Sequence, residues 1–432
     1  MNWRKTITIL TATSMVGALM PFTVMAESEP VKITIWTDED GAETTKYLNE
    51  FNEAYPEYNA EITYYQDDEL KEQLTVAISA GTAPTVIRGK VGSQLSDYVS
   101  AGAMLPLNDY AEQYGWYDMM YEDIEDALTY DGNLYEVPIK TGGKWGVLYY
   151  NADMAAELGI DLSADITLDE MIALKDTVEA GGYQLMALGN IDLWPALIMY
   201  GDYMMQQTTP DTIAGLNDGS IKWTECDAVL STFEAMQKLG TSGALISGYE
   251  SLDHISANQA WAAGKTLFMY CGTWWPSTVD GGLEGCGFDV HTILLPLVSE
   301  DTELQGQQFF ANEGYGINSS ATKEEADAAA AFLDYYYNID GQKAMFADME
   351  TYQANKVFND NLSEYGCVIN PLFEEEAFER QASLPQTNYS DWGYDTSVVE
   401  ELKDRMADLL AGSITPEEAA VSIQEVADEV VE

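Results

Sequence analysis

Two tryptophans stand side by side in residues 271–276, whose sequence is CGTWWP. Trp274 and Trp275 follow an apolar run and lie between Gly272 and Pro276, residue types that mark turns. Adjacent indoles on a turn offer a flat apolar surface, and outside the cytoplasm the C–H faces of sugars are common ligands of such surfaces. The pair leaves three readings open: a sugar carrier, a sugar-cleaving enzyme, or an aromatic core without a ligand.

Strand and helix patterns alternate at the start of the chain. Residues 31–36 alternate in polarity and are rich in β-branched side chains, which predicts a strand. Helical spacing follows over 44–55, and strand, helix and strand patterns cover 61–65, 69–80 and 85–87. This order indicates a parallel sheet covered by helices.

Further elements are predicted along the rest of the chain. Thr167, with Glu170 three residues later, forms a capping box that opens a helix to Val178, and Thr415 caps the last helix. The other predicted strands are 135–138, 145–150, 267–270 and 290–297, and the other predicted helices are 153–158, 228–239 and 323–337. No linker of biased composition is visible, so two domains would be joined by more than one crossing of the chain.

The charge balance excludes two classes of partner. The 432 residues carry 73 Asp and Glu against 19 Lys and Arg, for a net charge of −54. Nucleic acids and anionic membrane surfaces both require a basic footprint, so we expect neither as a partner. With 46% hydrophobic residues the chain can bury a sizeable core.

The N-terminus resembles an export signal. Arg4 and Lys5 precede a mostly apolar stretch, and small residues up to Ala26 fit a cleavage site, so residues 1–26 are predicted to be a signal peptide. A lipoprotein would need a cysteine at that point, and the first is Cys226. We therefore expect an exported protein with no direct lipid anchor.

Cysteine and histidine usage gives no metal site. No pair of cysteines has the C-x-x-C spacing of a zinc site. Cys271 and Cys286 could form a disulfide or remain free thiols, and the sequence does not choose between them. His254 and His291 are the only histidines and are too isolated to indicate a metal or catalytic site.

Several segments, in order, resemble the extracellular solute-binding proteins of sugar ABC importers, of the maltose-binding type. Residues 82–86 (TAPTV) are similar to the family's TAPDV turn, with Thr85 where Asp is usual. The other similar segments are 101–107 (AGAMLPL), 148–153 (LYYNAD), 263–274, 314–320, 332–342 and 411–419 (AGSITPEEA). Each motif alone is weak, and it is their common order and spacing that carries the resemblance.

The resemblance implies an α/β chain with a two-lobed, type II periplasmic-binding-protein fold and a ligand cleft between the lobes. By analogy, lobe 1 comprises residues 28–138 and 291–320, and lobe 2 comprises 139–290 and 321–432. It further implies a receptor that binds a neutral oligosaccharide, has no cofactor and catalyses no reaction. Hinge closure around the sugar would let it dock on a membrane permease, and we expect a monomer.

A sugar cleft needs aromatic faces for stacking and polar groups for hydroxyls, because a buried polar group without a partner costs about 1–3 kcal/mol. The candidates at strand ends, where ligands meet open α/β sheets, are Trp36, Asp40, Asp67, Asp68 and Arg88. The other candidates lie in predicted turns and loops: Trp145, Trp194, Trp274, Trp275, Asn312, Glu313, Tyr389 and Trp392. Core packing is the alternative for each tryptophan, Trp275 in particular, and a solvated loop is the alternative for the acids.

Two other functions fit parts of the sequence. Tryptophan and acid together can form a cage for a cation such as a polyamine, and the scarcity of Lys and Arg permits it. A glycoside hydrolase would need paired carboxylates, but with 73 acidic residues such pairs arise by chance. The carbohydrate receptor is the preferred reading.

Overall fold

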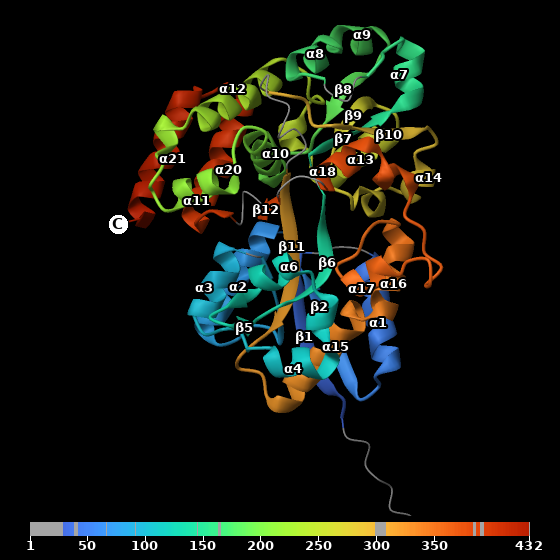
Figure 1. The fold of residues 1–432 in the computed structure, drawn as a ribbon, viewed down its shortest axis with the longest axis vertical. Helices are drawn as coiled ribbons and strands as arrows, with labels where there is room; N and C mark the ends of the chain where they lie inside the picture. The colour runs from blue at the N-terminus through green and yellow to red at the C-terminus, as the bar shows by residue number, and fades with distance from the viewer. Residues whose placement is uncertain are drawn as a thin grey trace, which may run out of the picture.

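The structure, a computed structural model of the chain, describes residues 29–38, 42–65, 67–90, 92–144, 146–162, 166–298, 308–382, 386–388 and 393–431. Two lobes lie one above the other in Figure 1, each built around its own sheet. The N-terminal strands and helices form most of the lower lobe, called lobe 1, and the upper lobe is called lobe 2. The predicted signal peptide lies outside the described residues.

Lobe 1 is built on a six-stranded sheet of order β12-β11-β3-β1-β2, with β6 also paired to β11. Strands β2 and β3 run parallel to β1, as predicted, whereas β11 runs antiparallel to β3 and β6. The strands are β1 (Val31–Thr37), β2 (Tyr58–Tyr64), β3 (Val86–Lys90), β6 (Val137–Lys144), β11 (Gln308–Ile317) and β12 (Gln386–Asn388). The sheet is therefore mixed, because the chain re-enters lobe 1 through β11.

Helices cover this sheet through apolar stripes. Phe51 of α1 meets Phe332 of α15 with ring centroids 5.2 Å apart, and both rings are buried. The elements around the sheet are α1 (Ala42–Ala54), α2 (Asp67–Ala80), α3 (Ser93–Ser100), α4 (Asn108–Tyr114), α5 (Trp116–Met119), α6 (Glu122–Ala127), the hairpin β4 (Thr129–Tyr130) and β5 (Asn133–Leu134), and α15 (Lys323–Tyr337). Thr322 and Glu325 form a capping box that fixes the start of α15.

Lobe 2 is built on a four-stranded sheet of order β10-β7-β9-β8. Its strands are β7 (Val147–Asn151), β8 (Gln184–Ala187), β9 (Thr266–Tyr270) and β10 (Val290–Leu294). Strand β9 is buried at every position, which agrees with its continuous apolar sequence. Only the β8–β9 pair is parallel, and β7 runs antiparallel to both of its neighbours.

Most of the remaining helices surround the second sheet. They are α7 (Ala152–Leu158), α8 (Leu168–Ala173), α9 (Lys175–Ala180), α10 (Trp194–Met205), α11 (Pro210–Asn217), η1 (Trp223–Glu225), α12 (Asp227–Thr241), η2 (Tyr249–Ser251), α13 (His254–Ala262), η3 (Trp275–Thr278), α14 (Gly282–Gly285), η4 (Pro371–Glu374), α18 (Glu376–Ala382), α20 (Thr396–Ala411) and α21 (Pro416–Val431). Helices α16 (Ile339–Met349) and α17 (Lys356–Asp360) link the lobes, since α16 contacts η3 and α17 contacts α5.

The predicted lobe boundaries differ from the structure at four points. Residues 139–144 of β6 and residues 386–388 of β12 are predicted for lobe 2, but both strands pair with β11 in the sheet of lobe 1. Residues 291–320 were assigned to lobe 1, but β10 pairs with β7 in the sheet of lobe 2. Residues 321–432 were assigned to lobe 2, but α15 packs on β1, β6 and β11 of lobe 1. The corrections at β10 and α15 have one cause: the chain returns to lobe 1 after β10 and remains there through α15.

The described residues contain no helix that is both long enough and apolar enough to cross a bilayer. All four cysteines are free in the structure, and Cys271 and Cys286 are both buried. Of the two alternatives that the sequence leaves open, a Cys271–Cys286 disulfide or free thiols, the structure has the free thiols.

Candidate ligand-binding site

Two of the predicted tryptophans meet at His254 in lobe 2. The ring centroids of Trp194 and His254 are 4.7 Å apart, and those of His254 and Trp274 are 6.3 Å apart. All three side chains are partly exposed. Trp194, His254 and Trp274 thus form an accessible aromatic surface, called here the lobe-2 cluster.

Three local features place these rings. Trp194 opens helix α10 next to Leu193, whose φ of 62° is a strained value for a bulky residue. His254 opens α13, where the Asp253 side chain caps the helix by accepting from the Ser256 amide. Trp274 packs across Gly272, where a Cβ atom would lie 2.2 Å from the indole, so only glycine fits.

The hydrogen bonds of His254 fix its tautomer. The Trp274 indole N–H, which can only donate, lies 3.4 Å from Nε2 of His254, and the Asn258 amide nitrogen lies 3.2 Å from the same atom. Nε2 must therefore carry the lone pair and Nδ1 the proton. No residue in the described part of the chain accepts a hydrogen bond from Nδ1–H.

The charge state of His254 agrees with this assignment. Burial lowers the pKa of His254 to about 4, against the opposing effect of the Asp253 carboxylate. The imidazole is therefore neutral at physiological pH. The lobe-2 cluster therefore consists of two indoles and one neutral imidazole whose Nδ1 carries the proton.

Asn258 connects His254 of the lobe-2 cluster to the residues packed behind it. Its amide nitrogen also lies 2.9 Å from the Thr278 hydroxyl and 3.5 Å from the thiol of Cys271. Burial raises the pKa of the Cys271 thiol, so it is a neutral packing group and not a nucleophile. These contacts hold α13 against η3 and keep His254 in one orientation.

Trp36 lies at the carboxyl end of the first strand of lobe 1, as predicted. Its ring is partly exposed and lies 5.2 Å from that of Tyr65, which follows β2. Asp38, two residues after Trp36, forms an ion pair with Arg88 on β3, with Oδ1 of Asp38 2.6 Å from Nε of Arg88. These four side chains come from three adjacent strands of the sheet.

Arg88 is buried against its neighbours in lobe 1. Its side chain is only 5% exposed, and besides Asp38 it contacts the Tyr315 hydroxyl at 3.2 Å. That hydroxyl is also 2.6 Å from the hydroxyl of Thr37. Little of the guanidinium is accessible, and its observed contacts are with Asp38 and Tyr315, so a direct contact of Arg88 with a ligand stays a prediction.

A buried carboxylate lies beneath this edge of lobe 1. Gly89 and Gly314 pair across β3 and β11, and Glu136 fills the space that their missing side chains leave. A Cβ atom on Gly89 would lie 2.1 Å from Oε1 of Glu136. The two glycines are therefore required by close approach and not by a turn.

Trp275 is wrong as a ligand contact. Its side chain is fully buried, and its ring lies 5.1 Å from that of Trp261 and 5.4 Å from that of Tyr149. Of the adjacent pair, Trp274 faces the accessible surface and Trp275 faces the core, because the 3-10 turn η3 begins between them.

The remaining candidates stay predictions. Asp40, Trp145, Tyr389 and Trp392 lie outside the described residues. Asp67 and Asp68 open helix α2, and Asn312 and Glu313 lie in strand β11, but the structure does not describe these four side chains. Residues 312–314 form continuous strand and not the predicted turn.

His254 is the residue that sequence reasoning missed. The sequence shows it as an isolated histidine, yet the fold brings it, at the start of helix α13, close to two tryptophans that are distant in sequence. The only signal in the sequence is the rarity of histidine, at two residues in the chain. Among the described residues, no group of three or more His, Cys, Asp or Glu could hold a metal ion.

Known proteins share both this sequence pattern and this fold. The sequence profile described as bacterial extracellular solute-binding protein matches residues 46–365, about three quarters of the chain. The chain belongs to this family.

The similarity to the two relatives is partial. An uncharacterized ABC transporter extracellular-binding protein of Pyrococcus horikoshii is 27% identical over 131 residues, which are 29% of this chain and 28% of the relative. An arabinooligosaccharide-binding protein of Halalkalibacterium halodurans is 26% identical over 153 residues, 34% of each protein. The aligned part therefore spans well under two thirds of either relative.

The structural similarity extends over nearly the whole of both chains. The solved structure of a chitin oligosaccharide binding protein superposes with a TM-score of 0.79 and covers 93% of this chain and 99% of that one. At 21% sequence identity, this match establishes the two-lobed solute-binding-protein fold and nothing about the ligand.

Proposed function

We propose that this solute-binding protein captures a neutral oligosaccharide between its lobes and delivers it to the membrane permease of an ABC importer. The observation that carries the proposal is the lobe-2 cluster, in which Trp194 and Trp274 flank the fixed N–H donor of His254. Indole faces match the apolar faces of sugar rings, and a single N–H donor matches a sugar oxygen.

The surroundings of the cluster support a binding surface. Ile191 and Ile255, next to the cluster in sequence, are 52% and 47% exposed. The Ile191 amide donates to the Leu252 carbonyl at 3.0 Å, which ties the loop before α10 to the segment before α13. Exposed apolar side chains that gather beside aromatic rings are typical of a ligand-binding face.

The opposing surface in this proposal is the edge of lobe 1 formed by Trp36, Tyr65 and Asp38. Closure of the lobes would place the sugar between this edge and the lobe-2 cluster, with the Asp38 carboxylate, held by Arg88, accepting from sugar hydroxyls. Asp40, Asp67, Asp68, Trp145, Asn312, Glu313, Tyr389 and Trp392 remain proposed contributors to the same cleft.

A neutral ligand fits better than a cation at this site. Nδ1–H of His254 presents the positive end of a bond dipole to the ligand, and the neutral ring adds no negative charge. A polyamine would gain from the protein's net charge of −54 but would meet this donor unfavourably. The second candidate, a cationic solute, is therefore ranked below the sugar.

The proposal assigns binding and no chemical step. Both related proteins and the solved structure carry names of binding proteins, and two of those names specify oligosaccharides of different sugars. The common feature is the oligosaccharide class, so the proposal extends to that class and to no single sugar. In this role the chain acts as an exported monomer, and a glycoside hydrolase is not proposed.

Isothermal titration calorimetry against xylo-, arabino-, malto- and chito-trisaccharides tests this function. We expect at least one to bind, and Trp194→Ala and Trp274→Ala each to weaken its affinity by about 5- to 30-fold, which corresponds to roughly 1–2 kcal/mol of lost indole burial. Tyr117→Ala, which changes a partly exposed aromatic on α5 of lobe 1, serves as the matched control and should bind as the wild type does.

Two outcomes would contradict the proposal. One is no heat with any neutral oligosaccharide from protein that unfolds cooperatively. The other is binding that both tryptophan variants leave unchanged, since the sugar would then lie elsewhere on the molecule.

A further inference from the structure

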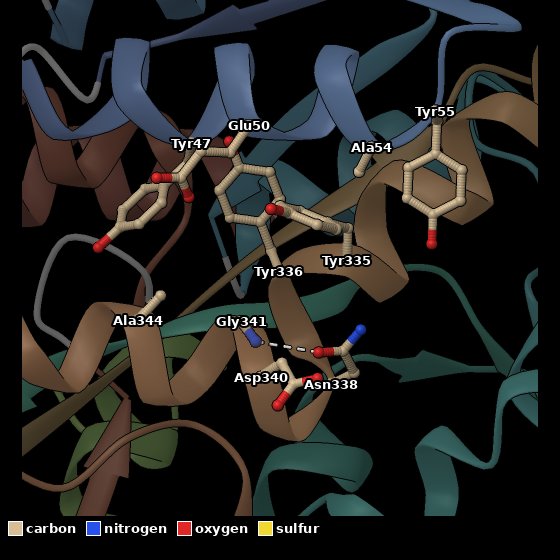
Figure 2. Close-up of a pocket in the computed structure, with 10 residues that line it drawn as sticks. All are labelled: Tyr47, Glu50, Ala54, Tyr55, Tyr335, Tyr336, Asn338, Asp340, Gly341 and Ala344. Atoms are coloured by element: carbon tan, nitrogen blue, oxygen red, sulfur yellow. Dashed lines mark hydrogen bonds between the residues drawn. The ribbon is translucent and has the colours of Figure 1, made fainter.

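A pocket lies on the side of lobe 1 between α1 and the α15–α16 corner (Figure 2). Its volume is about 400 Å³, within the range of pockets that hold small molecules. Four tyrosines line it, Tyr47, Tyr55, Tyr335 and Tyr336. None of these residues belongs to the lobe-2 cluster or to the Trp36 edge, so the pocket is a separate feature.

The tyrosine rings form one continuous aromatic wall. Tyr47 meets Tyr336 edge to face at 5.7 Å, Tyr336 meets Tyr335 at 5.9 Å, and Tyr335 meets Tyr55 at 6.1 Å. Each successive pair is close to perpendicular, with interplanar angles of 82°, 81° and 89°. Rings that alternate in this way present both faces and edges to the space they enclose.

Two carboxylates complete the lining. Glu50 projects from α1 and Asp340 from the start of α16, on opposite sides of the rings in Figure 2. Neither has an ion pair or hydrogen bond to another residue in the described part of the chain. Asn338, which also lines the pocket, is occupied in capping α16, because its Oδ1 accepts from the Gly341 amide at 2.9 Å.

The field inside the pocket is negative. Burial raises the pKa of the Tyr335 hydroxyl, and the charges of Glu50 and Asp340 raise it further. No Lys or Arg is among the residues that line the pocket. Lys46 lies beside the aromatic wall but does not line the pocket, and its Nζ lies 5.2 Å from the Tyr47 ring centroid. A ligand in the pocket itself meets aromatic faces and two carboxylates.

Small residues keep the pocket open. Ala54 and Ala344 stand at its edge. Gly341 permits the tight corner between α15 and α16, since a Cβ atom there would lie 2.2 Å from the Tyr335 carbonyl oxygen. Larger side chains at these positions would fill the space or push the helices apart.

From this geometry we propose that the α1–α16 pocket is a second ligand site that binds a small organic cation of the quaternary ammonium or alkylamine class. The tyrosine faces stabilise the cation through cation–π contacts, and Glu50 and Asp340 supply the compensating charge. A neutral sugar would leave both carboxylates without an opposite charge, which is why the two sites differ in ligand class.

Choline and its uncharged carbon analogue, 3,3-dimethyl-1-butanol, test this site by proton NMR titration of the intact protein. We expect choline to bind, and the analogue, which has the same shape without the charge, to bind at least about fivefold more weakly. Glu50→Gln and Asp340→Asn should each weaken choline binding by a similar factor. Raising the salt concentration to about 1 M should weaken it too, because ions screen the carboxylates.

The controls separate this pocket from general surface charge and from the sugar site. Glu53→Gln removes an exposed carboxylate from the same helix α1 and should bind choline as the wild type does. Trp274→Ala should also leave choline binding unchanged. The fold of each variant is checked by its thermal unfolding midpoint.

Four results would overturn the proposal: no choline binding, equal binding of choline and the uncharged analogue, an equal loss in Glu53→Gln and Glu50→Gln, or a loss in Trp274→Ala. The last result would place the cation in the lobe-2 cluster instead. The first three results leave the sugar proposal untouched, and the last would favour a cation as the ligand of the lobe-2 cluster, which the oligosaccharide titrations test separately.

Discussion

At the scale of single residues, His254 determines the hydrogen bonding and the charge of the lobe-2 cluster. The sequence alone identifies Trp194 and Trp274 as candidates. Trp274 lies in a predicted turn, and Trp194 lies in a predicted loop or turn. The sequence does not identify His254, because its role depends on an indole N–H that reaches its Nε2 from a different segment. The distinction between Trp274 and Trp275 is likewise decided by packing, as only one indole of an adjacent pair can face outward here.

The charge state of His254 makes sugar binding depend on pH in one direction. Because burial lowers its pKa to about 4, the ring stays neutral from about pH 8 down to about pH 5, and affinity should be flat over that range. As the pH falls toward 4, protonation of Nε2 removes the acceptor for the Trp274 indole, and affinity should fall. Calorimetric titrations at pH 8, 6 and 4.5 measure this profile.

The lowered pKa of His254 also makes the folding stability depend on pH. A histidine whose pKa is lowered by folding contributes stability that is present above its unfolded pKa of about 6.5 and is lost as the pH falls toward about 4. His254→Gln should flatten the acid side of both profiles, the affinity and the unfolding midpoint. An affinity that changed between pH 8 and 6 in wild type but not in His254→Gln would show that the ring is charged near neutrality, contrary to the assignment.

At the scale of elements, helix starts were the most predictable features. Thr167 with Glu170 and Thr415 with Glu418 each form the reciprocal hydrogen bonds expected from their sequence. The helix predicted over 323–337 has those same bounds. Capping chemistry is local, so three or four residues contain all of the information that it needs.

Strand β11 was not predictable for the opposite reason. The sequence Asn312-Glu313-Gly314 has turn composition, but β11 is held by pairing with β3 on one side and β6 on the other. Gly314 is needed there because Glu136 occupies the space above it. Contacts between segments that are far apart in sequence override the local preference.

The predicted and observed cap at Thr167 gives a stability test. Thr167→Ala removes the side chain that accepts from the Glu170 amide at 3.2 Å, and we expect a loss of about 1 kcal/mol in the free energy of unfolding. Thr177→Ala, an exposed threonine on the next helix, is the matched control and should change stability by less than about 0.5 kcal/mol. Urea denaturation of the three proteins measures both, and equal effects would mean that the capping box contributes nothing.

At the scale of the whole molecule, the two lobes follow from how often the chain passes between the sheets. The missing linker in the sequence correctly indicated more than one crossing, and β6 to β7 and β10 to β11 are two of them. The positions of the crossings came only from analogy and were wrong at β6, β10, α15 and β12, because strand pairing and helix packing are long-range properties. Multiple crossings at one edge are the arrangement expected of a hinge.

The central claim is that a neutral oligosaccharide binds against the lobe-2 cluster. A crystal structure of the protein with the tightest-binding trisaccharide tests it most directly. We predict a sugar ring against the indole of Trp194 or Trp274, a sugar oxygen within about 3 Å of Nδ1 of His254, and Trp36 and Asp38 brought to the other side of the ligand. A trisaccharide bound elsewhere, with both indoles uncovered and Nδ1 facing solvent, would contradict the account.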